Sequence, residues 1–133
     1  MFCLITQKHQ KKWKLNGSVH REKGPALEFS NGEKRWCKNG IMHRDNNLPA
    51  LEYEDGDKEY WLFGDKYELL DNNTKEFYYL GRLHRYLLPA IEYPNGDKEW
   101  WHDGKRHRRE GPAVIYGNKK FWFEHGEFIK CSI

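Results

Sequence analysis

One sequence pattern recurs along almost the whole chain and constrains its fold more than any other feature. It has the form Trp-x-x-Asn-Gly-x-x-His-Arg-x-x-Gly-Pro-Ala, followed by an aromatic residue, a second Asn-Gly or Asp-Gly, and Lys-x-Trp. The glycine of its first turn returns after 23, 24, 17, 23 and 22 residues, at Gly17, Gly40, Gly64, Gly81, Gly104 and Gly126. Such a chain is expected to fold as an array in which each copy packs on the next.

The copies differ in completeness. Four of them carry both His-Arg and Pro-Ala, whereas the copy that begins at Gly64 has Tyr67-Glu68 in place of His-Arg and no Pro-Ala. A longer period of 64 residues relates Gly17 to Gly81, which indicates duplication of a larger block. We therefore predict one repeat domain over residues 1–133, composed of a lead-in at 1–12, a first block at 13–76 with the degenerate third copy, and a second block at 77–133.

The composition favours a folded, aromatic-rich chain. Only 38% of the residues are apolar and 32% are charged, yet 16% are aromatic, and disordered chains lack aromatic residues. The 23 basic and 20 acidic residues leave a net charge of +3, which argues against nucleic-acid binding through bulk charge.

Cysteines and the N-terminus bear on the cellular setting. Three cysteines without a Cys-x-x-Cys pair indicate neither a disulfide framework nor a zinc site. The apolar run at residues 1–6 is too short for a signal-peptide core or a membrane span. A cytoplasmic protein without a membrane span is therefore expected.

Asn-Gly and Asp-Gly between extended segments predict β-hairpins, because both central residues of a type I′ turn need positive φ. If Asn31-Gly32 is a two-residue loop, its register pairs Leu27 with Trp36. The turns at Asp55-Gly56 and Asn95-Gly96 would likewise set an aliphatic residue opposite an aromatic one. Stacking of such hairpins must supply most of the stability, since each cross-strand pair contributes only about 0.2–1 kcal/mol.

The predicted fold class is all-β, an elongated and twisted antiparallel meander of tandem β-hairpin repeats. No stretch of the sequence has a convincing helical periodicity. Residues 66–75, in the degenerate copy, are the one place where an irregular loop or a short helical turn is expected to interrupt the array.

The segment Trp13-x-x-Asn16-Gly17-x-x-His20, with its loop and an aromatic strand ending at Asn31-Gly32, resembles the MORN repeat, and the likeness covers residues 13–130. The resemblance implies a hairpin scaffold for protein contacts, dimerisation or, in some members, phospholipid headgroups, and it does not imply catalysis. The chain departs from the MORN pattern where glycine usually follows the histidine, because it has arginine there, followed by Pro-Ala. This variant is similar to repeats of small phage and large-virus proteins, which implies residence in the host cytoplasm and makes a lipid role unexpected.

The repeated His-Arg pairs are candidate anion-binding residues, since an imidazole and a neighbouring guanidinium can both donate hydrogen bonds to a phosphate or a carboxylate. The alternative is structural: each histidine caps its own loop and each arginine pairs with a glutamate of an adjacent unit. Repetition favours the structural interpretation, because a residue needed for folding recurs in every copy. The candidate residues are His20, Arg21, His43, Arg44, His84, Arg85, His107 and Arg108, and the candidate glutamates are Glu28, Glu52 and Glu92.

The sequence predicts no metal site, no cofactor and no catalytic residue. His102 and His107 flank one Asp-Gly turn, but two ligands make a weak metal site. A histidine pair could act as general acid and base on a phosphodiester, yet no nucleophile elbow, phosphate loop or carboxylate pair accompanies it.

Doubled aromatic residues and one basic run are the candidate protein-binding residues. Consecutive residues of a strand point to opposite faces, so one member of each doublet lies away from the primary core, either under a second layer or on a partner surface. The residues expected to bind a partner are Trp61, Tyr79, Trp101, Phe123, Lys105, Arg106, Arg108 and Arg109.

Three functions follow from these features. The first is a non-catalytic protein-interaction module, for instance a small phage protein that inhibits a host defence protein. The second is a protein that sequesters a nucleotide or another phosphorylated small ligand, and the third is a histidine-dependent phosphodiesterase. The apolar terminal segments 1–6 and 128–133 also predict a homodimer formed through edge strands.

Overall fold

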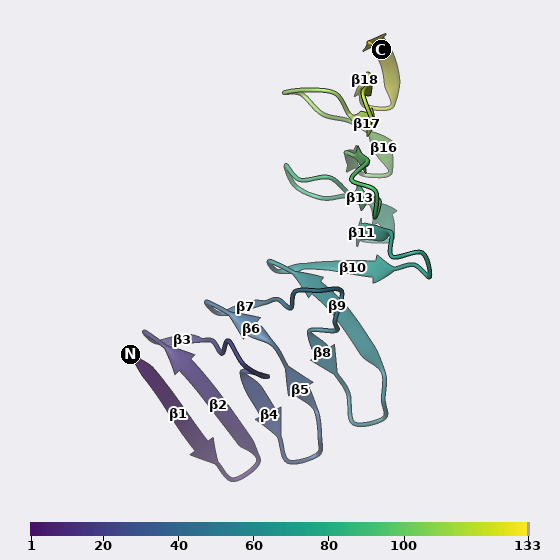
Figure 1. Cartoon of the computed structure of the whole chain (residues 1–133). Helices are drawn as coiled ribbons and strands as arrows, with labels where there is room; N and C mark the ends of the chain where they lie inside the picture. Colours follow the sequence, from purple (N-terminus) through teal and green to yellow (C-terminus); the bar gives the residue numbers. More distant parts are fainter. Residues whose placement is uncertain (133) are drawn as a thin grey trace. The chain divides into compact units, whose positions relative to one another are not determined.

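The computed structural model describes residues 1–132, which fold as β-strands and turns (Figure 1). The predicted all-β antiparallel meander is confirmed: fifteen of the described strands form one sheet in meander order, and two short hairpins lie outside it. The chain divides into two compact units, Met1–Lys66 and Tyr67–Ile133. The described chain contains no helix long and apolar enough to cross a membrane.

Unit 1 begins with a long hairpin, and shorter hairpins follow it (Figure 1). Its strands run in sheet order β1-β2-β4-β5-β8-β9, β3 pairs with β2, and β6 pairs with β7 as a separate hairpin. The bounds are β1 Phe2–Gln7, β2 Gln10–Leu15, β3 Ser18–Val19, β4 Leu27–Phe29, β5 Lys34–Arg35, β6 Cys37–Lys38, β7 Ile41–Met42, β8 Leu51–Glu52 and β9 Lys58–Leu62. Strand β10, Asp65–Leu69, spans the boundary between the units.

Unit 2 repeats this arrangement and ends with a long hairpin. Its strands run in sheet order β11-β13-β14-β17-β18-β19, β12 pairs with β11, and β15 pairs with β16 as a separate hairpin. The bounds are β11 Lys75–Tyr79, β12 Arg82–Leu83, β13 Ile91–Glu92, β14 Lys98–Glu99, β15 Trp101–His102, β16 Lys105–Arg106, β17 Val114–Tyr116, β18 Lys119–Glu124 and β19 Glu127–Ser132.

The first turn of each copy has the predicted two-residue form. Cys37 pairs with Met42 and Lys38 with Ile41, which leaves only Asn39 and Gly40 in the loop. Both loop residues have positive φ, as a type I′ turn requires. The same conformation holds at Asn16-Gly17, Phe63-Gly64, Leu80-Gly81, Asp103-Gly104 and His125-Gly126.

The register predicted at the second turn is wrong by one residue. Leu27 pairs with Arg35 rather than Trp36, so the loop contains three residues and the aliphatic residue does not lie opposite the aromatic one. The Asn31 side chain accepts a hydrogen bond from the backbone N–H of Glu33, and only Gly32 has positive φ. Asn31 thus acts through its side chain, which favours a three-residue loop with glycine in the left-handed position. The same shift pairs Leu51 with Glu59 and Ile91 with Glu99.

The prediction for residues 66–75 is also wrong, because this segment forms a hairpin. Strands β10 and β11 pair Tyr67 with Phe77 and Leu69 with Lys75. Asn73 takes the left-handed position at φ 70°, while Asn72 accepts a hydrogen bond from the backbone N–H of Thr74. The degenerate copy therefore keeps the second turn of the repeat, with asparagine in the position of glycine.

The alanines of the repeat form part of the core of each unit. Ala26, Ala50, Ala90 and Ala113, the alanines of Pro-Ala, are fully buried. Their carbonyls accept hydrogen bonds from the backbone N–H groups of the repeat aromatics, as in Trp36 to Ala50 at 2.7 Å and Trp100 to Ala113 at 2.7 Å. An alanine at this position lets the backbone of the loop lie close against the sheet.

Leu80 is expected to destabilise its turn. It has φ 51° and is 84% exposed, so an L-residue with a large side chain occupies the left-handed region with little packing in return. We predict that Leu80→Asn raises the free energy of unfolding by about 1 kcal/mol in denaturant titrations. The reciprocal change, Asn39→Leu, should lower it by a similar amount, and a loss of stability in Leu80→Asn would contradict the prediction.

Candidate functional site

Each complete copy, named here by its histidine, folds its His-Arg loop back onto its own aromatic residue. The guanidinium carbon of Arg44 lies 3.8 Å from the ring centroid of Trp36, a cation–π contact. The same arginine donates a hydrogen bond to the carbonyl of Pro49 at 3.0 Å. The other three copies repeat both contacts, with arginine–ring distances of 3.9, 3.8 and 3.8 Å for Arg21 on Trp13, Arg85 on Phe77 and Arg108 on Trp100.

Three of these arginines lie near the glutamates named in the sequence analysis. The nitrogen–oxygen distances are 3.7 Å for Arg21–Glu28, 3.8 Å for Arg44–Glu52 and 3.3 Å for Arg85–Glu92. In the His107 copy the corresponding position is Ile115, and burial lowers the pKa of Arg108. The arginines therefore join the loop, the ring and the following strand.

The histidine of each copy is hydrogen-bonded to the first turn of the next copy. Nδ1 of His43 accepts a hydrogen bond from the backbone N–H of Phe63 at 3.0 Å. This acceptor role places the ring proton of the neutral histidine on Nε2. The same bond joins His20 to Asn39, His84 to Asp103 and His107 to His125, at 2.9, 3.1 and 2.9 Å.

The second ring nitrogen divides the copies into two classes. In unit 1, Nε2 lies 2.8 Å from Glu22 in the His20 copy and 2.9 Å from Asp45 in the His43 copy. In unit 2 the corresponding positions are Tyr86 and Arg109, which offer no carboxylate. The histidines of unit 1 thus use both ring nitrogens within the fold.

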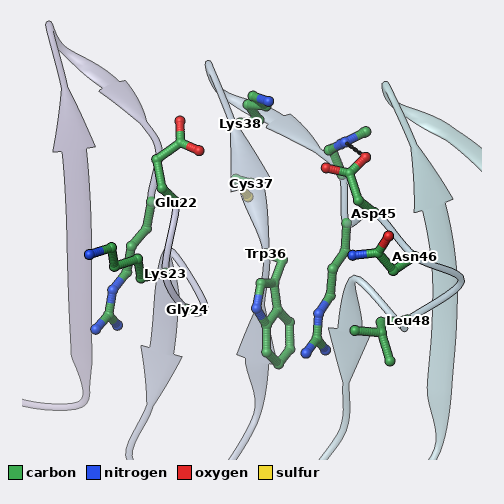
Figure 2. A pocket seen from close by; sticks show the side chains of 12 residues that line it. Glu22, Lys23, Gly24, Trp36, Cys37, Lys38, Asp45, Asn46 and Leu48 are labelled. Atoms are coloured by element: carbon green, nitrogen blue, oxygen red, sulfur yellow. Dashed lines mark hydrogen bonds and ion pairs between the residues drawn. The ribbon is translucent and has the colours of Figure 1, made fainter.

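A cavity of about 330 Å³ lies between the two His-Arg loops of unit 1. Figure 2 shows Glu22 and Lys23 on one side, Asp45 and Leu48 on the other, and Trp36 between them. The predicted anion-binding residues Arg21 and Arg44 line it together with Lys23 and Lys38, so four cationic side chains face two carboxylates. The structure thus brings the His-Arg pairs of the His20 and His43 copies together at one cavity.

Glu99 organises a second cluster, in unit 2. Its buried carboxylate accepts hydrogen bonds from Tyr93, Tyr116, Trp101 and Arg106. Burial alone would raise the pKa of Glu99, but these donors outweigh burial and lower it. The carboxylate therefore stabilises the fold fully above the ordinary glutamate pKa of about 4.3, and this contribution is lost as the pH falls through the lower folded-state value.

The predicted protein-binding residues fall into two groups. Trp61 and Trp101 are half-buried and donate hydrogen bonds from Nε1 to Glu59 and Glu99, each at 3.0 Å. The half-buried Phe123 and Trp101 rings both lie 5.4 Å from the guanidinium carbon of Arg106. Tyr79, Lys105 and Arg109 are exposed, whereas Arg106 and Arg108 are half-buried and hydrogen-bonded within the fold.

An exposed apolar segment of the His84 copy is not among the predicted site residues. Tyr86, Leu87 and Leu88 are 77%, 74% and 45% exposed, and Leu87 has φ 62°. The same loop reads Glu22-Lys23-Gly24 and Arg109-Glu110-Gly111 in the His20 and His107 copies. Comparison of the copies at these positions would have found it, because only this loop is wholly apolar.

No protein-family model matches the chain, and no similar curated protein or solved structure is found. The MORN-like resemblance therefore stays a prediction. The candidate surfaces rest on the geometry described above.

The histidine–turn hydrogen bond is expected to be essential to stability. His43 is buried, and its replacement by alanine would leave the Phe63 N–H without its acceptor. We predict that His43→Ala lowers the free energy of unfolding by about 1–3 kcal/mol. Asp45→Ala, which removes only the exposed Nε2 partner, should lower it by less than about 1 kcal/mol. Equal losses in the two variants, measured by denaturant titration, would contradict this assignment.

Proposed function

We propose that the protein is a non-catalytic protein-interaction module whose partner binds the exposed apolar loop Tyr86-Leu87-Leu88. The observation that carries the proposal is the exposure of three consecutive large apolar side chains in one loop of the repeat. Large apolar side chains gathered on a surface are typical of protein interfaces. The corresponding loops of the His20 and His107 copies are charged.

Backbone strain occurs in the same copy of the repeat. Leu80 and Leu87 both have positive φ, a conformation that costs a leucine about 1–2 kcal/mol. Asparagine tolerates this conformation, and it occupies the position of Leu80 in two other copies, as Asn16 and Asn39. Strained residues that persist at exposed positions are frequent at binding sites.

The same repeat presents further exposed side chains to a partner. Tyr79 is 60% exposed, and its ring centroid lies 5.6 Å from that of His84. Tyrosine is enriched at the centres of interfaces because its ring buries a large area and its hydroxyl can hydrogen-bond. Lys105 and Arg109 of the next copy supply exposed positive charge for polar contacts at the rim.

A non-catalytic role accounts for the repeated histidines. His20 and His43 are buried, and both ring nitrogens of each make hydrogen bonds that hold the fold. A general acid or base needs a ring nitrogen that reaches its substrate. Inhibition of a host protein by a phage protein is the specific form of this proposal that the variant repeat suggests.

A second candidate function is the sequestering of a nucleotide or another phosphorylated small ligand. The cavity between the His20 and His43 copies favours it, because four cationic side chains outnumber two carboxylates there. Arg21 and Arg44, however, already contact Pro25 and Pro49 and lie near Glu28 and Glu52. The remaining cations, Lys23 and Lys38, are therefore the ones available for a ligand.

Homodimerisation through edge strands is proposed as an assembly route. Among the described strands, β1 pairs only with β2, and β19 pairs only with β18. Phe2 and Leu4 on β1 and Phe128 and Ile129 on β19 are more than half exposed. Unpaired edges with apolar side chains favour pairing with another strand.

The apolar loop can be tested by giving it the charged sequence of the His20 copy. We predict that the triple variant Tyr86→Glu/Leu87→Lys/Leu88→Gly stays folded and loses the partner that the wild-type protein retains in quantitative affinity capture. At least a tenfold loss of affinity is expected, because removal of a buried aromatic anchor costs about 2 kcal/mol or more.

The matched control is Glu22→Ala/Lys23→Ala in the same loop of the His20 copy, which should leave capture unchanged. Loss of the partner in the control but not in the triple variant would move the binding site to the cavity of unit 1. If the wild-type protein, the triple variant and the control all capture the same partners, the apolar loop is not the binding site.

A further inference from the structure

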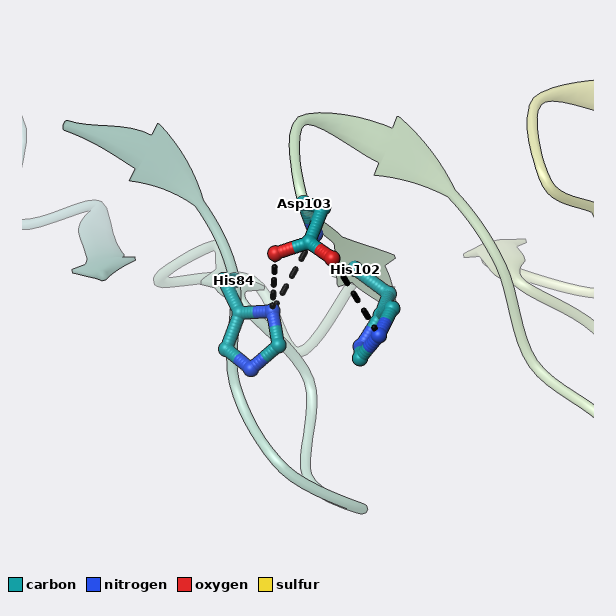
Figure 3. Close-up of side chains that lie close together, drawn as sticks. All are labelled: His84, His102 and Asp103. Carbon is teal, nitrogen blue, oxygen red and sulfur yellow. Dashed lines mark hydrogen bonds and ion pairs between the residues drawn. The ribbon is translucent and has the colours of Figure 1, made fainter. Parts of the chain in front are cut away.

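Two histidines and an aspartate of unit 2 lie together where the His84 copy meets the next turn. Figure 3 shows His84 and His102 on either side of Asp103, with its carboxylate between them. One ring nitrogen of each histidine and one carboxylate oxygen all lie within 4.8 Å of one another. The separations are 3.6 Å from His84 Nδ1 to Asp103 Oδ1 and 3.5 Å from His102 Nε2 to Asp103 Oδ2.

The repeat architecture creates this arrangement. Nδ1 of His84 accepts the backbone N–H of Asp103, as every repeat histidine does with the following turn. That bond places the turn residue and the residue before it against the ring, and the centroids of His84 and His102 are 4.5 Å apart. A metal-ligating side chain at the turn residue, or at the residue before it, therefore lies close to a histidine whose position is fixed by the fold.

The ligand set occurs in this form at one of the four histidine–turn junctions. The positions of His102 and Asp103 are occupied by Lys38-Asn39 after His20, by Leu62-Phe63 after His43 and by Glu124-His125 after His107. A residue set that departs from the repeat in this way is not explained by the needs of the fold.

We propose that His84, His102 and Asp103 form a binding site for a divalent transition-metal ion of the zinc class. Imidazole nitrogens and a carboxylate oxygen are zinc ligands at bond lengths of about 2.0–2.2 Å, and two histidines with one acidic residue are a known zinc ligand set. Bonds of that length in a tetrahedron separate neighbouring ligand atoms by about 3.3 Å. The separations of 3.6 and 3.5 Å run from the two histidines to the two different oxygens of Asp103, and one ligand atom of each residue lies within 4.8 Å of the others, so modest side-chain rotation brings the set to that spacing.

Three protein ligands leave a fourth position for water or for a group from another molecule. Coordination through His84 Nδ1 replaces its hydrogen bond to the Asp103 N–H with a bond to the metal, which then joins the two copies. The side chains of His102 and Asp103 are exposed, so rotation about their side-chain bonds can bring their ligand atoms within bonding distance of one metal ion. This site is independent of the apolar loop proposed above.

The test is titration of the full chain with Co²⁺, followed by displacement with Zn²⁺. The expected result is one equivalent of bound Co²⁺ with the visible absorption of a tetrahedral site, lost when Zn²⁺ is added. The variant His102→Lys/Asp103→Asn should lose this signal. Its new residues are those at Lys38-Asn39, where the same turn forms, so its unfolding midpoint should stay near that of the metal-free wild-type protein.

His125→Asn is the matched control, because His107 and His125 form another ring pair, with centroids 4.2 Å apart. The control should bind Co²⁺ as the wild-type protein does. Loss of binding in His125→Asn with retention in His102→Lys/Asp103→Asn would overturn the assignment. Absence of binding to the wild-type protein, or a thiolate-to-metal absorption band that points to a cysteine, would also overturn it.

Discussion

The hydrogen bond from the backbone N–H of four first turns to Nδ1 of the preceding histidine is the interaction on which the complete copies depend. Strand pairing alone joins neighbouring hairpins along very short strands, several of them only two residues long. The histidine adds a contact between successive copies that recurs at each of the four histidines, of which His20 and His43 are buried and His84 and His107 half-buried. A short-stranded sheet with 32% charged residues has little aliphatic core, so such polar links must be satisfied throughout.

The arginine complements this link by holding the loop of its own copy. Stacking on an aromatic ring and donating to a proline carbonyl fix the loop above the sheet, and the fully buried alanine beneath lets it approach closely. The repeat therefore uses His-Arg as structure, which agrees with the argument that a residue present in every complete copy serves the fold.

Much of this could be predicted from the sequence. The glycine spacing indicates a hairpin array, and Asn39-Gly40 identifies a two-residue turn because both residues tolerate positive φ. The length of the loop at the second turn could not be predicted from the Asn-Gly pair alone. Asn31 can either take positive φ in a two-residue loop or accept a hydrogen bond with its side chain in a three-residue loop. The hydrogen bond from the Glu33 N–H to the Asn31 side chain favours the three-residue loop. The hairpin at 66–75 was not predicted because Asn73, rather than a glycine, takes the position with positive φ in its turn.

The candidate sites were harder to predict, since they depend on which copies come together. His102 was paired with His107 from proximity in sequence, whereas the structure brings it closer to His84, eighteen residues earlier. The Tyr86-Leu87-Leu88 loop differs from the corresponding loops of the other copies in sequence, but its exposure depends on the fold.

The hydrogen bond between successive copies joins a side chain to a backbone group, and this difference decides which of its two positions can vary in sequence. The acceptor is a histidine side chain in all four complete copies, but the donor is a backbone N–H that any residue except proline supplies. Asn39, Phe63, Asp103 and His125 all serve as donors, with four unrelated side chains. A single substitution at the turn position can therefore add a new side chain beside the histidine and keep the junction. The limit is the positive φ of this position, which is unfavourable for most side chains.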